Sequence, residues 1–343
     1  MTRPTDEPLL SVRNLKTEFV LDEGTVKAVD DVSFDVHPGE VVGIVGESGC
    51  GKSATIKSVL RIIEKPGRIS SGSIIFQKPG EQPVDLVTLD QRGKHMRAIR
   101  GGDIALIPQE PMAAFSPVHT IGNQLIEAIR LHQKVSKQQA RDIAIERLKD
   151  VSMPNPEQSL KNYSWELSGG LRQRAMIGMA LSCRPSLLIA DEPTTAIDVT
   201  TQAQVLDLLR KLRQQHNSAI IFITHDLGVI AQLADHVVVM YLGRVMESAP
   251  IDDIFHRPQH PYTQALLQSI PTLKTVNRSV LPTIDGSIPH PFTRPAGCPF
   301  FNRCKDAMPG TCDRHAPEAV NVSATQLVSC FKFQSDGSME RHK

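Results

Sequence analysis

Short apolar runs separated by polar stretches recur along the chain up to about residue 250. The clearest of them are Val41–Val45, Leu187–Ala190, Ala219–Ile223 and Val237–Tyr241. Each run has the length of a strand that is buried on both faces of a parallel sheet. A membrane-spanning helix needs about 20 consecutive apolar residues. No run approaches that length, so the sequence predicts that any association with a membrane goes through a partner protein.

Helical periodicity alternates with these runs. Apolar residues recur on one face over Lys52–Ile63, and Ser136 is placed to cap another helix that reaches about Val151. Further helices are expected at 171–183 and 200–215, whereas residues 9–45 and 67–107 have strand patterning interrupted by polar loops. Strands that alternate with helices predict a doubly wound α/β core.

The character of the sequence changes after Pro250. Proline becomes frequent, and regular periodicity is weak except near Tyr262–Ile270. Four of the six cysteines also fall in this part of the chain, between Cys298 and Cys330. The sequence therefore predicts a core domain over residues 9–250 and a C-terminal domain over residues 251–343.

Composition places the chain among ordinary globular proteins. Of its 343 residues, 40% are apolar and 22% are charged, which is enough to bury a full-sized core. The formal net charge of +1 provides no large basic field, so we expect no nucleic acid partner. The first eight residues, MTRPTDEP, lack the apolar core of a secretion signal.

The segment GESGCGKS, Gly46–Ser53, matches the pattern of a phosphate-binding loop between a strand and a helix. Its glycines let the backbone turn successive N–H groups toward an anion, and the following helix adds its positive N-terminal end. Lys52 can reach the β- and γ-phosphates, and the Ser53 hydroxyl can ligate Mg²⁺. A ligand-free glycine turn is the alternative, and the strand before it and helix after it argue against that alternative.

Two carboxylates follow an apolar strand in the segment LLIADEP, Leu187–Pro193. Asp191 is placed to hold the magnesium ion, and Glu192 is placed to polarise the attacking water as a general base. A strand that merely ends in an acidic turn is common, but the phosphate loop upstream favours a catalytic interpretation.

The segment LSGGLRQR, Leu167–Arg174, resembles the signature motif of the ABC-type ATPases. A serine cap, two glycines and a helix N-terminus form a second anion site. In that family the signature of one subunit closes over ATP held by the phosphate loop of another. Leu171 stands where glutamine is usual, so a contact to the ribose is in doubt.

The resemblance extends to further motifs in the expected order. Gln109 resembles the glutamine that senses magnesium and water, and His225 resembles the switch histidine that contacts the γ-phosphate. The segment from Thr194 to Asp198 resembles the D-loop, with Ile197 where leucine is usual. Phe19 either stacks on adenine or packs in the core. The nucleotide-binding residues that the resemblance implies are Phe19, Gly46, Glu47, Ser48, Gly49, Cys50, Gly51, Lys52, Ser53, Ala54, Ser168, Gly169, Gly170 and Asp198.

In chemical terms the resemblance implies an ATPase that uses ATP and Mg²⁺. The implied catalytic residues are Lys52, Gln109, Glu192 and His225, and the implied magnesium ligands are Ser53, Gln109 and Asp191. The implied fold is a nucleotide-binding α/β core with an antiparallel β subdomain, a helical subdomain at about 113–168, and a small irregular cysteine-rich C-terminal domain.

Residues 258–270 resemble the segment that begins the C-terminal domain in the oligopeptide/dipeptide importer branch of this family. The four C-terminal cysteines continue this match, and several members of the branch carry a [4Fe–4S] cluster on such cysteines. The implied cluster ligands are Cys298, Cys304, Cys312 and Cys330. From the residues alone, a zinc ion, free thiols and disulfides remain alternatives.

The resemblance implies an ATP-hydrolysing subunit that energises the import of di- or oligopeptides at the cytoplasmic face of the cell (inner) membrane. The implied partners are two transmembrane permease subunits, an extracytoplasmic substrate-binding protein and a second, non-identical ATPase subunit. Oligosaccharide, nickel or opine cargo is an alternative. A soluble ABC ATPase that acts on ribosomes or DNA is less favoured, because tandem cores and long heptad insertions are missing from the sequence. An exporter half is less favoured because its fused membrane helices are missing.

Overall fold

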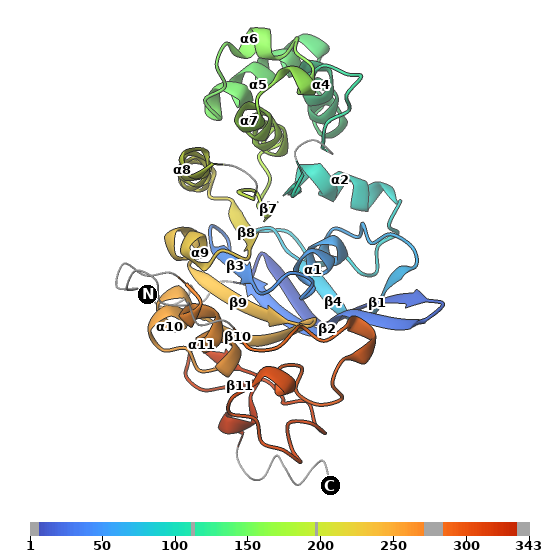
Figure 1. Cartoon of the computed structure of the whole chain (residues 1–343). Helices are drawn as coiled ribbons and strands as arrows, with labels where there is room; N and C mark the ends of the chain where they lie inside the picture. The colour runs from blue at the N-terminus through green and yellow to red at the C-terminus, as the bar shows by residue number, and fades with distance from the viewer. Residues whose placement is uncertain (1–6, 111–113, 196–197, 271–283, 335–343) are drawn as a thin grey trace. The chain divides into compact units, whose positions relative to one another are not determined.

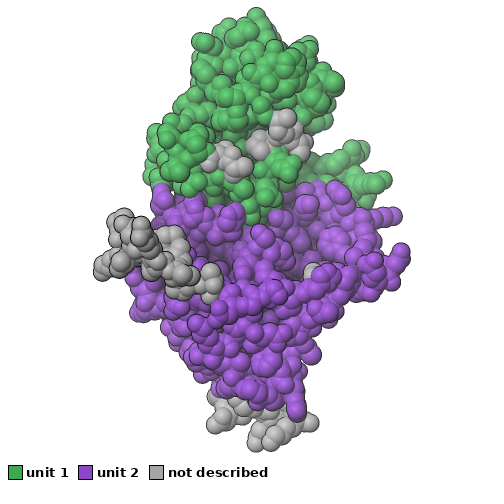
Figure 2. All heavy atoms as spheres, in the orientation of Figure 1, with its two compact units in different colours: residues 1–10, 36–41, 76–223 green, residues 11–35, 42–75, 224–343 purple. Residues whose placement is uncertain are grey.

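The computed structural model describes residues 7–110, 114–195, 198–270 and 284–334, and its backbone divides into two compact units (Figure 2). Unit 1 comprises residues 1–10, 36–41 and 76–223, and unit 2 comprises residues 11–35, 42–75 and 224–343. Both units draw on distant parts of the sequence. The division into domains over residues 9–250 and 251–343 stays a prediction.

Parallel strands form the sheet of unit 1. Strands β6 (Ile104–Ile107), β7 (Leu187–Asp191) and β8 (Ala219–Thr224) lie in that order, with Leu187 opposite both Ile104 and Ala219. Every residue of β7 and β8 is buried. These are the apolar runs of the sequence, and the prediction that they form buried parallel strands is confirmed.

Helices make up most of the remainder of unit 1. They are α2 (Lys94–Gly102), α4 (Ile121–His132), α5 (Lys137–Asp150), α6 (Pro156–Ser159), the 3₁₀ turn η1 (Ser164–Glu166), α7 (Gly169–Ala180) and α8 (Val199–His216), with a short strand β5 (Val84–Asp85). Ser136 caps α5 as predicted, in a reciprocal capping box with Gln139. We expected strands and loops where the structure has α2. The sequence did not indicate this helix, because only Met96 and Ile99 of it are buried, which is too few for a helical pattern.

Unit 2 contains a sheet in the order β2-β1-β4, formed by β1 (Leu10–Leu21), β2 (Gly24–Val36) and β4 (Gly67–Phe76). It also contains β3 (Val41–Val45), which pairs in parallel with β9 (His236–Tyr241), and β10 (Arg244–Pro250), which pairs antiparallel with β9. Its helices are α1 (Lys52–Val59), α9 (Leu227–Leu233), α10 (Ile251–His256) and α11 (Pro261–Gln268).

The C-terminal region extends the β9–β10 sheet. Strand β12 (Leu327–Val328) pairs antiparallel with β10, and β11 (Val320–Asn321) pairs with β12. Around these strands the described chain forms 3₁₀ turns, namely η2 (Pro291–Thr293), η3 (Phe301–Arg303) and η4 (Phe331–Phe333). Figure 1 shows this orange and red segment against β10.

A buried carboxylate holds this attachment together. Glu247 of β10 is fully buried, and its carboxylate accepts hydrogen bonds from the backbone N–H groups of Gln259 and His260, both at 2.9 Å. The Gln326 side chain donates a third, at 2.7 Å. Because a buried carboxylate without donors is strongly destabilising, Glu247 requires the C-terminal chain in this place.

An ion cluster ties the C-terminal segment to the β1–β2 hairpin. The Asp30 carboxylate of β2 lies 2.9 Å from the guanidinium groups of both Arg244 and Arg294, and all three side chains are largely buried. The ring of Phe292 also lies over Gly24. Burial alone would raise the pKa of Asp30, but the two guanidinium groups outweigh it and lower this pKa.

In the part of the chain that the structure describes, no helix combines the length and apolar character needed to cross a bilayer.

Replacing Asp30 with Asn should lower the free energy of unfolding by about 3 kcal/mol at pH 7, because it leaves Arg294 buried without its counter-charge. The lowered pKa of Asp30 means that its stabilising contribution is present above the unfolded-state value near 4 and is lost as the pH falls through the lower folded value. The difference between the wild type and D30N, measured by urea unfolding, should therefore shrink as the pH is lowered below 4.

Asp306→Asn provides the matched control, because the Asp306–Lys332 pair is exposed. It should change the free energy of unfolding by less than about 1 kcal/mol. A D30N variant as stable as the wild type at pH 7 would contradict the assigned role of the Asp30 cluster.

Candidate functional site

The predicted phosphate loop lies in unit 2 between β3 and α1, as its motif requires. Gly46, Gly49 and Gly51 all have positive φ, at 150°, 79° and 100°. A β-carbon on Gly46 would lie 2.2 Å from the Met240 carbonyl oxygen, and one on Gly51 would lie 2.3 Å from that of Ala28. Glycine is therefore required at both positions by conformation and by close packing. A β-carbon added to Gly49 would have no atom within 4 Å.

Lys52 is buried within this loop. Its ammonium group donates hydrogen bonds to the carbonyl oxygens of Gly46 at 2.8 Å and Glu47 at 3.1 Å, so the loop curls around the cation. Helix α1 starts directly after Gly51, has no side-chain cap and has no acidic residue in its first turn. A cation and an uncapped helix N-terminus at one loop are suited to binding phosphate.

The remaining residues of the loop differ in exposure. Ser48 and Gly49 are exposed, Ser53 and Ala54 are half-buried, and Cys50 is buried. Burial raises the pKa of the Cys50 thiol despite the nearby Lys52 cation. Cys50 therefore lies in the loop as a buried, neutral thiol.

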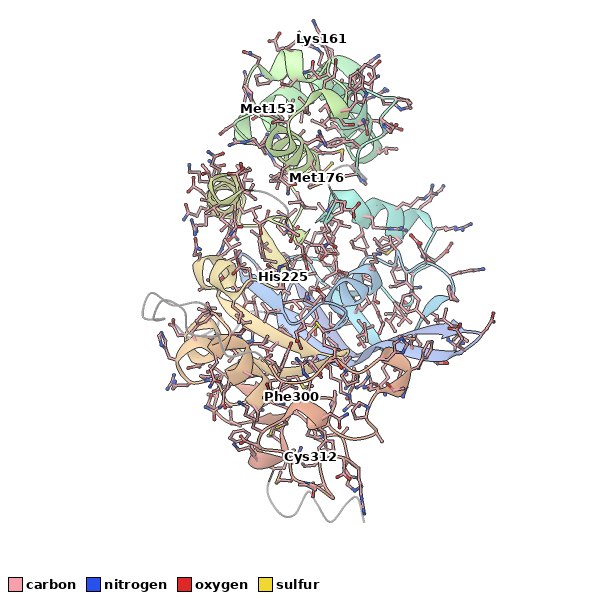
Figure 3. The ribbon with its side chains drawn as sticks, in the orientation of Figure 1. Met153, Lys161, Met176, His225, Phe300 and Cys312 are labelled. Atoms are coloured by element: carbon pink, nitrogen blue, oxygen red, sulfur yellow. The ribbon has the colours of Figure 1, made fainter. Side chains whose placement is uncertain are left out.

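Two other predicted residues belong to unit 2. His225 follows the end of β8, is exposed, and is labelled in Figure 3. Its neighbour Asp226 caps α9 and accepts hydrogen bonds from the N–H groups of Gly228 and Val229. Phe19 is half-buried in β1, with its ring beside Gly67. Adenine stacking by Phe19 stays a prediction.

The predicted magnesium ligand Asp191 and the predicted general base Glu192 lie at the end of β7 in unit 1. Asp191 is the buried last residue of the strand, and Glu192 follows it in a left-handed conformation with φ 47°. The backbone N–H of Glu192 donates to the Ile223 carbonyl at 3.0 Å. This hydrogen bond fixes the backbone from which the Glu192 carboxylate extends.

The Glu192 side chain is oriented by two donors. The Thr195 hydroxyl donates to Oε2 at 2.9 Å, and the Gln109 amide donates to the same oxygen at 3.3 Å. The structure thus brings together Gln109 and Glu192, which are 83 residues apart in the chain. Thr195 lies in the segment that we compared with the D-loop, but the sequence did not indicate its hydrogen bond to Glu192.

The signature motif begins α7 in unit 1. Ser168 caps this helix by accepting a hydrogen bond from the Leu171 N–H at 3.4 Å. Gly169 is exposed, and a β-carbon added to it would meet nothing within 4 Å. Gln173 of the same helix donates to the Pro193 carbonyl at 2.7 Å. The signature helix and the carboxylate turn are therefore linked directly, which the sequence did not indicate.

Asp198 caps α8 and accepts hydrogen bonds from the Thr201 N–H at 2.9 Å and the Thr201 hydroxyl at 2.7 Å. These donors lower the pKa of Asp198. Its neighbour Ile197, which we compared with the usual leucine of the D-loop, lies outside the described residues.

The C-terminal cysteines converge on a single small cavity in unit 2. Cys298, Cys304, Cys312 and Cys330 all line it. Their backbones also meet, since the Cys298 N–H donates to the Cys312 carbonyl at 2.7 Å. Burial, reinforced by the neighbouring thiols, raises the pKa of Cys298 to about 12. All six cysteines are described by the structure, and none is joined to another in a disulfide.

Among the described residues, no three or more His, Cys, Asp or Glu side chains are grouped so as to hold a metal ion. A tetrahedral zinc site needs sulfur atoms within about 3.8 Å of one another, given Zn–S bonds of about 2.3 Å. The thiols therefore share a cavity without forming the compact arrangement of a single-ion site.

Glu47 of the phosphate loop has partners that the sequence did not reveal. Its carboxylate pairs with Arg303, and its backbone N–H donates to the Tyr262 hydroxyl. Arg303 stands directly before Cys304 in the sequence, and no local pattern links it to Glu47.

Comparisons with known proteins agree with these motifs. The family model "ABC transporter" matches residues 29–195. A second model, "Oligopeptide/dipeptide transporter, C-terminal region", matches residues 246–312.

Full-length relatives extend the similarity. A probable peptide ABC transporter ATP-binding protein of Sinorhizobium fredii is 45% identical over 96% of this chain and 97% of the relative. A dipeptide transport ATP-binding protein of Bacillus subtilis is 47% identical over 95% of each. The oligopeptide transport ATP-binding protein of the same organism is 44% identical over 96% of this chain and 98% of that protein.

Solved structures share the fold at low identity. The dimeric ATP-binding cassette MJ0796, in a post-hydrolysis state with ADP and phosphate, aligns with a TM-score of 0.62 at 23% identity, over 71% of this chain and 98% of that one. The cbiO1 protein of Clostridium perfringens aligns with a TM-score of 0.59 at 24% identity, over 74% and 92%. The prediction of an ABC ATPase fold is thereby confirmed, and the chain belongs to the ABC transporter family as an ATP-binding cassette protein with a C-terminal region of the oligopeptide/dipeptide transporter type.

Proposed function

We propose that the chain is the ATP-hydrolysing subunit of an importer for di- or oligopeptides. The observation that carries this proposal is the similarity of 44–47% over nearly the whole length to proteins named as peptide, dipeptide and oligopeptide transport ATP-binding proteins. The match of residues 246–312 to the oligopeptide/dipeptide transporter C-terminal region supports the same branch.

We assign the chemistry of each residue from the motif in which it stands. Lys52 and the N-terminus of α1 bind the phosphates of ATP, and Ser53, Gln109 and Asp191 hold Mg²⁺. Glu192 acts as general base toward the attacking water, with its carboxylate held in place by Thr195 and Gln109. His225 contacts the γ-phosphate, and Ser168 with the N-terminus of α7 contacts a nucleotide held by a second subunit.

The assembly that we propose has two ATPase subunits, each site combining the phosphate loop of one with the signature of the other. We propose a non-identical sister ATPase, two transmembrane permease subunits and an extracytoplasmic substrate-binding protein as partners. The chain would act at the cytoplasmic face of the inner membrane as a peripheral subunit. Closing and reopening of the ATPase pair would drive the permease.

Glu192→Gln should reduce ATP hydrolysis by roughly 10²- to 10⁴-fold, because the amide cannot accept the proton of the attacking water. The affinity for MgATP should change little, because the amide still accepts hydrogen bonds from Thr195 and Gln109. Steady-state phosphate release and nucleotide titration measure the two quantities separately. Glu157→Gln, on an exposed residue of α6 that is not among the predicted site residues, is the matched control. An E192Q variant that hydrolyses ATP like this control would contradict the role of Glu192.

Cells that lack the chain should recover the uptake of a radiolabelled dipeptide when the wild-type gene is restored, and should not recover it with E192Q. Uptake of an oligosaccharide and of nickel, measured in the same strains, tests the alternative cargoes. Restoration of either of these without restoration of peptide uptake would replace peptide as the cargo while leaving the ATPase assignment in place.

We also propose that the four C-terminal cysteines hold a [4Fe–4S] cluster. The donor set fits this group, since four thiols line one cavity and four cysteine thiolates are the usual ligands of such a cluster. Bound there, the cluster would serve as a structural clip for a segment whose described elements are 3₁₀ turns and two-residue strands.

Protein purified without oxygen should have a broad visible absorption band and contain about four iron and four sulfide ions per chain. Cys312→Ser should abolish the band because it removes one ligand, whereas Cys183→Ser, in the turn after α7 in unit 1, should retain it. A colourless wild-type protein, or one with a single zinc ion, would refute the cluster and leave the ATPase assignment unchanged.

A further inference from the structure

An acidic side chain lies within the phosphate loop, in a place where anions must bind. Glu47 follows the first glycine of the loop, and its carbonyl oxygen accepts a hydrogen bond from the Lys52 ammonium group at 3.1 Å. Its carboxylate is matched by Arg303 in a bidentate pair, with N–O distances of 2.7 and 3.0 Å. The two residues are 256 positions apart in the chain.

Arg303 is held rigidly in this position. Only 4% of its side chain is exposed. Its guanidinium group also donates to the Tyr241 hydroxyl at 3.2 Å and to the Asp285 carbonyl at 3.1 Å. A buried arginine with several acceptors around its planar group has a fixed orientation. The geometry therefore fixes where the Glu47 carboxylate lies.

A second contact fixes the backbone at the same residue. The Glu47 N–H donates to the Tyr262 hydroxyl at 3.0 Å. Tyr262 is fully buried and packs in a cluster with Tyr241 and Phe300, with ring centroids 4.7–5.4 Å apart. Burial strongly raises the pKa of Tyr262, so its hydroxyl stays protonated.

These contacts come from the segment that carries the cysteines. Arg303 ends the turn η3, which lies between Cys298 and Cys304, and its backbone N–H donates to the Phe300 carbonyl at 3.0 Å. Phe300 and Cys312 are labelled in Figure 3, both in the C-terminal segment. The same short turn thus lines the cysteine cavity on one side and holds the phosphate loop on the other.

We propose that Arg303 and Tyr262 are positioning residues through which the C-terminal segment sets the affinity of the phosphate loop for nucleotide. Arg303 neutralises a carboxylate that would otherwise repel the phosphates, and Tyr262 fixes the backbone where the loop begins. This inference rests on the nucleotide binding proposed above. It adds a regulatory role for the C-terminal region, since a change in that segment reaches the nucleotide through Glu47.

The test compares the affinity for MgATP of the full-length wild type with that of R303M, E47Q and the double variant R303M/E47Q, by isothermal titration calorimetry. R303M should raise the Kd about three- to tenfold, because an unpaired carboxylate then lies beside the bound phosphates. E47Q should bind MgATP more tightly than the wild type, because it removes the negative charge of Glu47 and leaves the positive charge of Arg303. The double variant should recover most of the affinity that R303M loses, since the repelling charge is gone.

Two further variants separate this role from general stability. Arg303→Lys should retain most of the wild-type affinity, because it keeps the positive charge, and it also covers the case in which R303M fails to fold. Lys332→Met breaks an exposed ion pair of the same segment and should leave the Kd unchanged. The loss in R303M should also shrink in high salt.

The inference is overturned if R303M binds MgATP like K332M, or if the double variant binds as weakly as R303M. The second result would mean that Arg303 acts only by supporting the fold. The Kd of the wild type for MgATP is measured separately from the Kd ratios between the variants and the wild type. A wild type that binds no nucleotide would refute the proposed function and, with it, the role of Arg303.

Discussion

The close packing of the phosphate loop is the constraint on which the rest of unit 2 depends. The loop must curl around the Lys52 ammonium group, and this brings its backbone within contact of the Met240 and Ala28 carbonyls. Only glycine is accommodated at positions 46 and 51. The turn after β9 completes the support, because the Gly243 N–H donates to the Cys50 carbonyl at 2.8 Å. A loop so enclosed has its N–H groups in place before an anion arrives, which lowers the entropic cost of binding.

The C-terminal region contributes to this arrangement although its own secondary structure is sparse. Within unit 2, three carboxylates pair with this region: Glu247 in the sheet, Asp30 on the hairpin and Glu47 in the phosphate loop. Each is a carboxylate that the C-terminal chain supplies with donors. Burying a carboxylate without hydrogen-bond donors costs folding free energy. These contacts therefore favour one position of the C-terminal segment. Polar contacts with the core therefore place the irregular segment together with its buried aromatic side chains, such as Phe300.

In unit 1, hydrogen bonds between side chains position the turn that follows β7. The strand β7 delivers Asp191 and Glu192 to the carboxyl end of a parallel sheet, where side chains from neighbouring connections can meet. Thr195 and Gln109 then restrict the Glu192 carboxylate, and Gln173 connects the signature helix to the same turn. The hydrogen bond between Gln173 and Pro193 gives the signature helix a direct mechanical link to the carboxylate turn.

Local sequence alone determined the buried strands, the capped helix after Ser136, the phosphate loop and the order of the family motifs. These features depend on residues that are close in the chain, namely apolar periodicity, caps and glycines, and for them the sequence was sufficient. It failed at α2, where the apolar signal is too short to separate a helix from a loop. The tertiary structure alone decided that the Gln109 amide donates to the Glu192 carboxylate and that Arg303 pairs with Glu47 across 256 residues. Such pairings have no local signature, because the distance between two side chains in the fold depends on how the strands and turns that carry them pack.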